Sequence, residues 1–273
     1  MLDNSMQTPI TPRLFKIDLY PFKSLDGVTV PSADVLPSGA LKHDRTFALA
    51  DKSEKFVNAK RYASIHQVRS RFSDDMTEIT VWTNDSTDPN TFHLLHDQEK
   101  LEAWFSQYFA QPVTLQQNLE QGFPDDTISP GPTVISTATL QAIAGWFDLS
   151  LSETRSRFRT NLEITGVPAF WEDQLFSESG EPVPFTIGDV MFEGINPCQR
   201  CVVPTREPQT GAATAGFQKQ FSQQRAETLP ETVARSRFNH FYRLSVNTRL
   251  SPASTSRSLK VGDAITLIKT EMH

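Results

Sequence analysis

Short runs of strand-forming residues recur along this chain, and each run is soon followed by Gly, Pro, Asn or Asp. The run from Leu14 to Leu19 alternates apolar and polar residues, as a half-buried strand does, and Tyr20-Pro21 follows it. Because Gly and Pro interrupt regular elements, this punctuation favours many short strands over long helices. We predict a mainly β fold with some helix, in the α+β class. Further strands are expected at residues 28–30, 47–50, 78–83, 92–95, 158–164, 185–192, 242–246 and 264–268.

Two segments have helical periodicity instead. Between Gln98 and Ala110 the apolar residues recur at spacings of three and four, which predicts an amphipathic helix. Residues 136–146 predict a second helix that is entered through small hydroxyl residues. The polar, Gln-rich residues 217–237 contain few apolar side chains, so we expect a mobile excursion or a short helix there and not part of the core.

The length of the chain, 273 residues, is enough for two ordinary domains. Residues 116–132 are rich in Gln, Asp, Pro and Gly, which is typical of a loop. We place the boundary there and expect two closely packed, β-barrel-like units at residues 10–125 and 126–273.

The charge of the chain disfavours several classes of partner. It holds 32 Asp and Glu against 26 Lys and Arg, a formal net charge of −6, so no general basic field attracts nucleic acid or an anionic membrane. No apolar run is long enough to span a bilayer, and the first residues do not resemble a signal peptide. We therefore expect a cytoplasmic protein that binds neither membrane nor nucleic acid.

The only two cysteines, Cys198 and Cys201, form one C-x-x-C unit, so their chemistry is local. Such a unit permits half of a zinc site, a dithiol redox pair or a thiolate ligand to a soft metal, and two small buried residues with only a structural role are a further alternative. Zinc would need two more ligands, and the six His residues offer no paired signature nearby, so no zinc is expected.

The residues around the cysteines favour a thiolate over a thioredoxin-like pair. A thioredoxin-like pair needs a helix that begins at the first Cys, and Pro204 and Pro208 disfavour that helix. Arg200 and Arg206 would stabilise a thiolate, which is the form that binds molybdenum, zinc or copper.

The string Pro-Cys-Gln-Arg-Cys, which ends at Cys201, is followed by Thr205, Glu207-Pro208 and Thr210-Gly211. This segment resembles the molybdenum-binding segment of MOSC-domain proteins, especially those similar to the mitochondrial amidoxime reducing component and its bacterial relatives. The resemblance implies that Cys201 is the metal ligand, with Cys198 as the alternative. Glu207 stands where those relatives carry Asp, and Pro204 stands where they carry Thr.

Three further regions resemble the same family in the same order, so the resemblance spans nearly the whole chain. Tyr20-Pro-Phe-Lys-Ser24 and His43-Asp-Arg45 are similar to parts of its N-terminal β-barrel domain. Arg157-Phe-Arg-Thr-Asn161 is similar to an Arg-Phe-Arg-Pro-Asn segment that contacts the cofactor, with Thr160 in place of Pro. Val261-Gly-Asp263 is similar to a terminal barrel strand of the MOSC domain.

The resemblance implies that the molybdenum cofactor, molybdopterin with Mo, lies in a cleft between the two units. Its phosphate would need cations with several donors, such as a Lys and the planar forks of Arg, while Ser and Asn could bind the polar pterin edges. Taken singly, each of these residues is more often a surface side chain, a local ion pair or a cap. The implied cofactor-binding residues are Lys23, Ser24, Arg45, Ser129, Arg159, Asn161 and Cys201.

The activity that the resemblance implies is that of a molybdenum-dependent oxidoreductase, which removes oxygen from small N-hydroxylated compounds. The sequence shows no flavin or nicotinamide fingerprint and no second cysteine cluster, so electrons would come from a separate ferredoxin, cytochrome or reductase. One alternative is a non-catalytic molybdenum cofactor carrier. Another is a sulfur carrier with a persulfide on Cys201 or Cys198. Full sulfurases of this group also carry a pyridoxal-phosphate domain, which a chain of this length is not expected to include.

Overall fold

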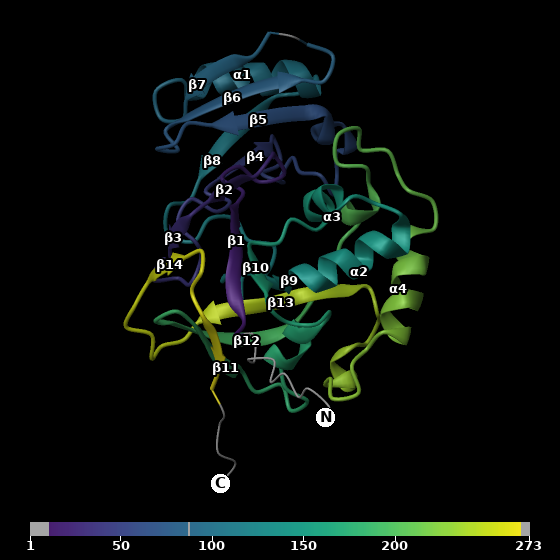
Figure 1. Ribbon diagram of the computed structural model, residues 1–273. Coiled ribbons are helices and arrows are strands. Elements are labelled where there is room, and N and C mark those ends of the chain that lie inside the picture. Colours follow the sequence, from purple (N-terminus) through teal and green to yellow (C-terminus); the bar gives the residue numbers. More distant parts are fainter. Residues whose placement is uncertain (1–10, 87, 269–273) are drawn as a thin grey trace, which may run out of the picture.

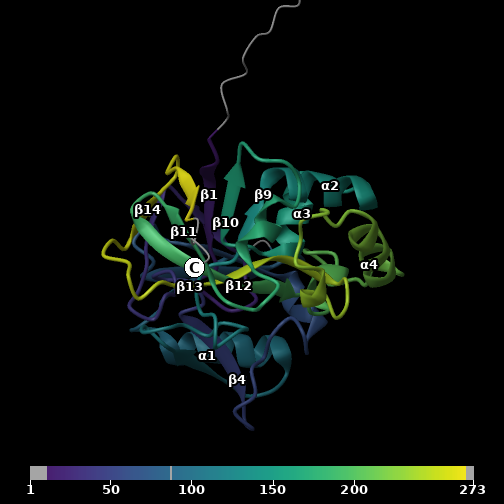
Figure 2. The ribbon, with the colours of Figure 1, turned by 90° about the horizontal axis from the view of Figure 1, so that it is seen from below.

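The computed structural model describes residues 11–86 and 88–268. Within them lie fifteen strands, four α-helices and four short 3-10 helices, which confirms the predicted mainly β, α+β class. In Figure 1 a large sheet occupies the centre, a smaller β-layer with α1 covers one end, and α2, α3 and α4 lie together on one side. Figure 2 shows the same three helices grouped on one side when the molecule is turned.

The central sheet has eight strands, and all neighbours in it are antiparallel except β9 and β10. The N–H of Leu14 donates to Asp263 O at 2.8 Å, and the N–H of Gly262 donates to Leu14 O at 2.7 Å. These bonds bring the β15 edge round to β1, so the sheet curls on itself as the sheet of a barrel does. In order across the sheet, the strands are β15 (Ile265–Leu267), β11 (Val183–Ile187), β12 (Val190–Gln199), β13 (Arg243–Leu250), β9 (Val134–Ser136), β10 (Leu162–Thr165), β1 (Arg13–Leu19) and β2 (Val28–Val30).

Two helices connect the parallel strands β9 and β10, because parallel neighbours need a crossover and cannot be joined by a tight turn. They are α2 (Thr137–Phe147) and α3 (Leu151–Phe158). Ser136 caps α2, as its hydroxyl accepts from the N–H of Thr139 at 3.0 Å. The strand predicted at residues 158–164 is therefore wrong in its first part, since Phe158 ends a helix and β10 begins only at Leu162.

Residues 47–117 form the layer at one end of the molecule (Figure 1). Its apolar side chains, with Ile79 and Phe105 among the fully buried ones, form a core separate from that of the large sheet. The strand predicted at residues 92–95 ends two residues early, because a turn follows His93. The elements are β4 (Phe47–Asp51) paired with β8 (Val113–Gln117), the sheet of β5 (Val68–Phe72), β6 (Glu78–Thr83) and β7 (Asn90–His93), and α1 (Gln98–Phe109).

Strands of the two halves of the chain pair with each other. Strand β1 comes from the first half, yet it pairs with β10 of the second half. Likewise β3 (Ser32–Asp34) pairs with β14 (Ser258–Lys260). These pairings tie the N-terminal residues into the sheet of the C-terminal half and hold the segment after β1 against the segment before β10.

The predicted strand at residues 185–192 is a hairpin, in which β11 and β12 turn at Gly188. The polar segment after Gly216 forms α4 (Phe217–Glu227), whose Phe217, Phe221 and Arg225 are buried. The expected short helix is thus present, but the expectation that it lies outside the core was wrong. The 3-10 helices are η1 (Ala63–Gln67), η2 (Trp171–Leu175), η3 (Val203–Thr205) and η4 (Arg235–Arg237).

Among residues 11–86 and 88–268, no helix combines the length and the apolar character needed to cross a bilayer.

Candidate functional site

A cavity of about 750 Å³ lies between the two halves of the chain. Because β1 is antiparallel to β10, with Ile17 opposite Leu162, the segment that follows β1 meets the segment that precedes β10. These two segments form one part of the cavity wall, and the last residues of β12 form another part. All eight residues singled out from the sequence line this one cavity: Lys23, Ser24, Arg45, Ser129, Arg159, Asn161, Cys198 and Cys201.

On the first-half side, an acidic residue that sequence analysis did not single out pairs with the cations. Lys23 is 8 % exposed, and its Nζ donates to Asp125 Oδ1 at 2.8 Å. Lys60 Nζ lies 3.1 Å from the same oxygen. Burial acts to raise the pKa of Asp125, but the two lysines outweigh it and hold this pKa well below its usual range. Burial also lowers the pKa of Lys23, against the opposing effect of Asp125.

Three of the lining residues have left-handed backbone that non-glycine residues rarely adopt. The φ angles are 75° at Ser24, 50° at Arg45 and 51° at Arg159. Residues held in this region are enriched at ligand-binding positions, because the surrounding structure must enforce a conformation that is costly by itself. At Arg159 the enforcing contact is visible, since its N–H closes the last turn of α3 on Arg155 O at 2.8 Å.

Arg159 is the cation best placed to take an external anion. Its guanidinium carbon lies 4.1 Å from the centroid of the Tyr20 ring, and that of Arg45 lies 5.4 Å from the same ring. Arg45 pairs with Asp44, whereas Arg159 has no carboxylate partner within the described part of the chain. Burial lowers the pKa of Arg159, and the nearby Arg45 adds to that effect. An anion at this point would relieve both penalties.

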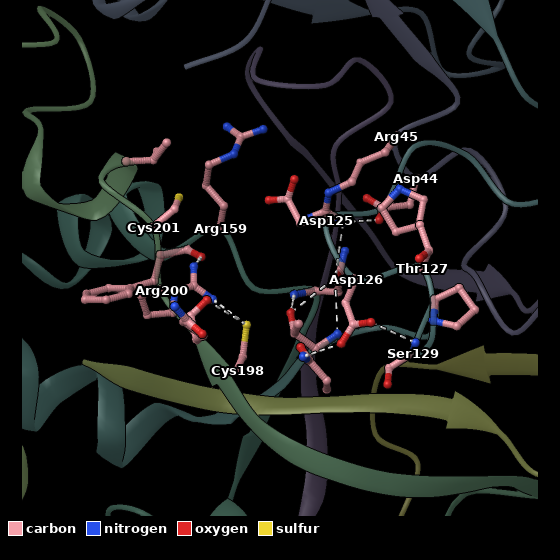
Figure 3. A pocket seen from close by; sticks show the side chains of 18 of the residues that line it. Asp44, Arg45, Asp125, Asp126, Thr127, Ser129, Arg159, Cys198, Arg200 and Cys201 are labelled. Atoms are coloured by element: carbon pink, nitrogen blue, oxygen red, sulfur yellow. Dashed lines mark hydrogen bonds and ion pairs between the residues drawn. The ribbon is translucent and has the colours of Figure 1, made fainter. Parts of the chain in front are cut away.

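Both cysteines are free and partly exposed. Cys198 lies in β12, and Cys201 follows in the turn before η3. Arg200 Nη1 donates to Cys198 Sγ at 3.4 Å. Figure 3 shows the two cysteines on one side of the cavity, with Asp44, Arg45 and Ser129 on the other.

The loop that carries Ser129 is fixed to the central sheet. Asp126 Oδ1 accepts from the N–H groups of Ile128 and Ser129 at 3.0 and 3.1 Å, and its Oδ2 accepts from Asn247 Nδ2 of β13 at 3.1 Å. Ser129 is 4 % exposed, and its buried hydroxyl has no hydrogen-bond partner within the described residues. A buried polar atom without a partner is costly, so this hydroxyl is available to a ligand in the cavity.

These features fit a pterin cofactor with a terminal phosphate. The cavity offers cations for a dianion, an unpartnered hydroxyl at Ser129 and a free thiol at Cys201. Asn161 also lines it, but its amide already bonds within the protein, since Oδ1 accepts from the N–H of Thr133 at 3.3 Å and Nδ2 donates to Asp18 O at 3.1 Å. Sequence analysis missed other lining residues because they come from loops and strand ends that no motif marks. These are Lys60, Asp125, Arg237, Arg243 and Asn247.

Comparison with known families matches the two halves separately. Residues 11–112 match the MOSC N-terminal beta barrel domain, and residues 133–266 match the MOSC domain. Together these matches cover most of the chain, which therefore belongs to the MOSC-domain proteins. The family resemblance inferred from the motifs is confirmed.

Curated relatives of the chain are molybdenum cofactor sulfurases. The protein of Drosophila grimshawi is 24 % identical over 95 % of this chain and 35 % of its own length. That of Caenorhabditis briggsae is 22 % identical over 73 % of this chain and 30 % of its own length. The chain thus spans about a third of the length of these relatives, and the similarity connects it with molybdenum cofactor biochemistry.

Proposed function

We propose that this protein holds the molybdenum cofactor between its two halves and acts as an oxidoreductase on small N-hydroxylated compounds. One observation carries the proposal. The partly exposed, free thiol of Cys201 lines the same cavity as Arg159 and the cations of the first half. Arg159 has no carboxylate partner among the described residues. A thiolate ligand and an anion-binding wall are the two features that a phosphorylated, metal-bearing pterin requires.

The proposed roles follow from the chemistry of each side chain. Cys201 supplies the thiolate ligand, with Cys198 as the alternative. Ser129 binds a polar edge of the pterin through its unpartnered hydroxyl. Asn161 can add to this only with the amide hydrogen that its bond to Asp18 O leaves over. The proposed phosphate-binding residues are Lys23, Ser24, Arg45 and Arg159.

The reaction consumes two electrons and two protons and converts an N-hydroxylated compound into the amine and one water. When bound, the cofactor supplies the two-electron centre that takes up the oxygen. The residues of this chain fix the position of the cofactor and leave space in the cavity for the substrate. The electrons come from a separate ferredoxin, cytochrome or reductase.

We also propose the extents of the two domains. The N-terminal barrel domain comprises residues 10–125, and the MOSC domain comprises residues 126–273. Because β1 pairs with β10 and β3 with β14, these domains would not be independent bodies but would share hydrogen-bonded strands.

A carrier is the second candidate. The curated relatives are sulfurases, and both cysteines of this chain are partly exposed, as a persulfide-bearing cysteine must be to hand on its sulfur. A carrier of sulfur or of intact cofactor would bind the same pterin in the same cavity, but it would not reduce N-hydroxylated compounds.

The first test is elemental analysis for molybdenum, with fluorescence of the oxidised pterin, on protein from a host that makes the cofactor. Loaded protein is then assayed for reduction of benzamidoxime with an artificial electron donor. Turnover supports the oxidoreductase, whereas loaded protein without turnover supports a carrier. Absence of both metal and pterin contradicts both.

The variant Cys201→Ala tests the ligand assignment. We expect it to lose metal-dependent reduction but to keep the pterin, because the phosphate contacts remain. Cys198→Ala is the matched control and is expected to have a milder effect. If Cys201→Ala is as active as the parent protein, Cys201 is not the ligand. Complete loss in Cys198→Ala would move the ligand role to that residue.

A further inference from the structure

The end of the cavity near Cys198 contains three arginines without an acidic partner. Arg200, Arg237 and Arg243 all line the cavity, and none of them forms an ion pair with a carboxylate within residues 11–86 and 88–268. They donate only to neutral oxygens or to sulfur. The acceptors are Cys198 Sγ at 3.4 Å and Phe158 O for Arg200, Ser177 O at 3.0 Å and Ile195 O at 3.3 Å for Arg237, and Pro197 O at 2.8 Å and Asn239 Oδ1 at 2.8 Å for Arg243.

The opposite end of the cavity differs in this respect, because most of its cations are neutralised. There, Lys23 and Lys60 share Asp125, and Arg45 pairs with Asp44. Four arginines of the cavity lining thus lack a carboxylate partner among the described residues: Arg159, and the three at the end near Cys198.

The fold holds these three arginines near one another. The register of β12 and β13 places Gln199 opposite Arg243, and the N–H of Arg200 donates to Tyr242 O at 3.1 Å. Burial lowers the pKa of Arg243; Cys198 opposes this effect, and the charge of Arg237 adds to it. In addition, Arg200 Nε is buried without a hydrogen-bond partner in the described structure. Three neighbouring cations that lack a carboxylate partner are stabilised when an oxyanion binds between them.

We propose that this end of the cavity is a substrate subsite for a carboxylate, so that the protein prefers N-hydroxylated compounds that carry a negative charge. The planar fork of an arginine binds a carboxylate with two parallel hydrogen bonds. Cys201 follows Cys198 by three residues, so a substrate anchored here has its other end near the proposed metal ligand. The inference rests on the proposed function, because it assigns a substrate class to the same cavity.

The test compares two substrates that differ by one ring carboxylate, benzamidoxime and 4-carboxybenzamidoxime, on the cofactor-loaded full chain. We expect a KM about tenfold lower for the carboxylated compound, since hydrogen bonds to charged groups are among the strongest in proteins. In Arg237→Gln and in Arg243→Gln, the ratio of the two KM values should fall by about tenfold. The lysine variants, which keep the charge, should retain part of the preference.

Arg235→Gln is the matched control. Arg235 belongs to the same 3-10 helix as Arg237, but it is exposed and does not line the cavity. Its loss removes the same charge from the protein, so it should leave the KM ratio unchanged. Circular dichroism on all variants checks that they fold.

Two results would overturn the subsite: equal KM values for both compounds in the parent protein, or loss of bound pterin from folded Arg237→Gln and Arg243→Gln. The second result would assign these arginines to the phosphate of the cofactor. If neither compound is reduced, the proposed function fails, and calorimetric binding of the two compounds to the same protein still decides the subsite. The subsite is supported if the carboxylated compound binds more tightly to the parent protein and this advantage is lost in Arg237→Gln and Arg243→Gln but kept in Arg235→Gln. Equal binding of the two compounds to the parent protein contradicts the subsite.

Discussion

At the scale of single residues, Asp125 neutralises part of the cavity wall that we propose for the phosphate. Its carboxylate is 57 % exposed and contacts Lys23 Nζ at 2.8 Å and Lys60 Nζ at 3.1 Å. An anion bound to these lysines would compete with this carboxylate. We expect Asp125→Asn to strengthen the binding of inorganic pyrophosphate by about tenfold, because a negative charge a few ångströms from the ligand is removed. Calorimetry on protein produced without cofactor measures the change.

The control for that measurement is Asp74→Asn, which removes an exposed carboxylate in the turn before β6, away from the cavity. Its pyrophosphate affinity should equal that of the parent protein. If Asp125→Asn also binds no more tightly than the parent protein, the lysines that pair with Asp125 do not form an anion site.

Glu172 gives the protein a predictable dependence of stability on pH. It is 1 % exposed, neither carboxylate oxygen has a hydrogen-bond partner in the described structure, and burial, reinforced by the charge of Asp173, raises its pKa to about 7. A carboxyl group with a raised folded-state pKa contributes its full stability below its unfolded value, and this contribution is lost as pH rises through 7. We expect the free energy of unfolding to fall by about 3 kcal/mol from this group between pH 4 and pH 9.

The variant Glu172→Gln isolates this effect, since glutamine does not ionise. Urea unfolding at pH 5.5 and pH 8.5 should show a smaller loss of stability in Glu172→Gln than in the parent protein. The exposed Glu120 provides the control, and Glu120→Gln should keep the pH dependence of the parent. If the parent protein is equally stable at both pH values, the pKa of Glu172 is not raised in the folded protein.

At the scale of elements, α4 shows how a polar helix can carry part of a core. One face of this helix is buried and consists of residues four positions apart, Phe217, Phe221 and Arg225. The Gln residues between them make the composition of the segment polar. Arg225 pairs with Asp173, and its guanidinium carbon lies 4.3 Å from the centroid of the Phe170 ring. The spacing of the two Phe residues and Arg225 was the available signal, and composition concealed it.

Phe221→Ala tests the contribution of α4 to stability. Phe221 is fully buried, so the variant should lose about 3–5 kcal/mol of unfolding free energy through lost apolar contact and a cavity. Phe15 is 48 % exposed, and Phe15→Ala should lose much less. Urea denaturation measures both variants. Equal losses would mean that α4 is not part of the cooperative core.

Local pattern identified most strands, because alternation and turn residues act within a few positions. It also identified Lys23, Arg159 and Cys201 as members of one set, through their resemblance to a family, and the structure places them around one cavity. Pattern could not show that β1 pairs with β10 or that Asp125 meets Lys23, because both contacts join segments more than a hundred residues apart. Such contacts depend on the topology of the sheet, for which a single sequence carries no local signal.

At the scale of the whole molecule, the strand pairings between the two halves predict that the halves unfold together. Strand β1 is hydrogen-bonded into the central sheet, and β3 is bonded to β14, so neither half can unfold without breaking backbone pairs of the other. The chain offers a direct test, because Trp82 and Trp104 report on the first half, and Trp146 and Trp171 report on the second.

Two variants separate the signals: Trp146→Phe with Trp171→Phe leaves the first-half reporters, and Trp82→Phe with Trp104→Phe leaves the others. We expect the midpoint of urea unfolding from tryptophan fluorescence to coincide with that from circular dichroism in each variant, as a two-state transition requires. Loading with cofactor should then raise both fluorescence midpoints together, because a ligand held by both halves stabilises the single folded state. If the fluorescence and circular dichroism midpoints differ within either variant, the paired strands do not couple the two halves. If cofactor raises the fluorescence midpoint in only one of the variants, the cofactor is held by that half alone.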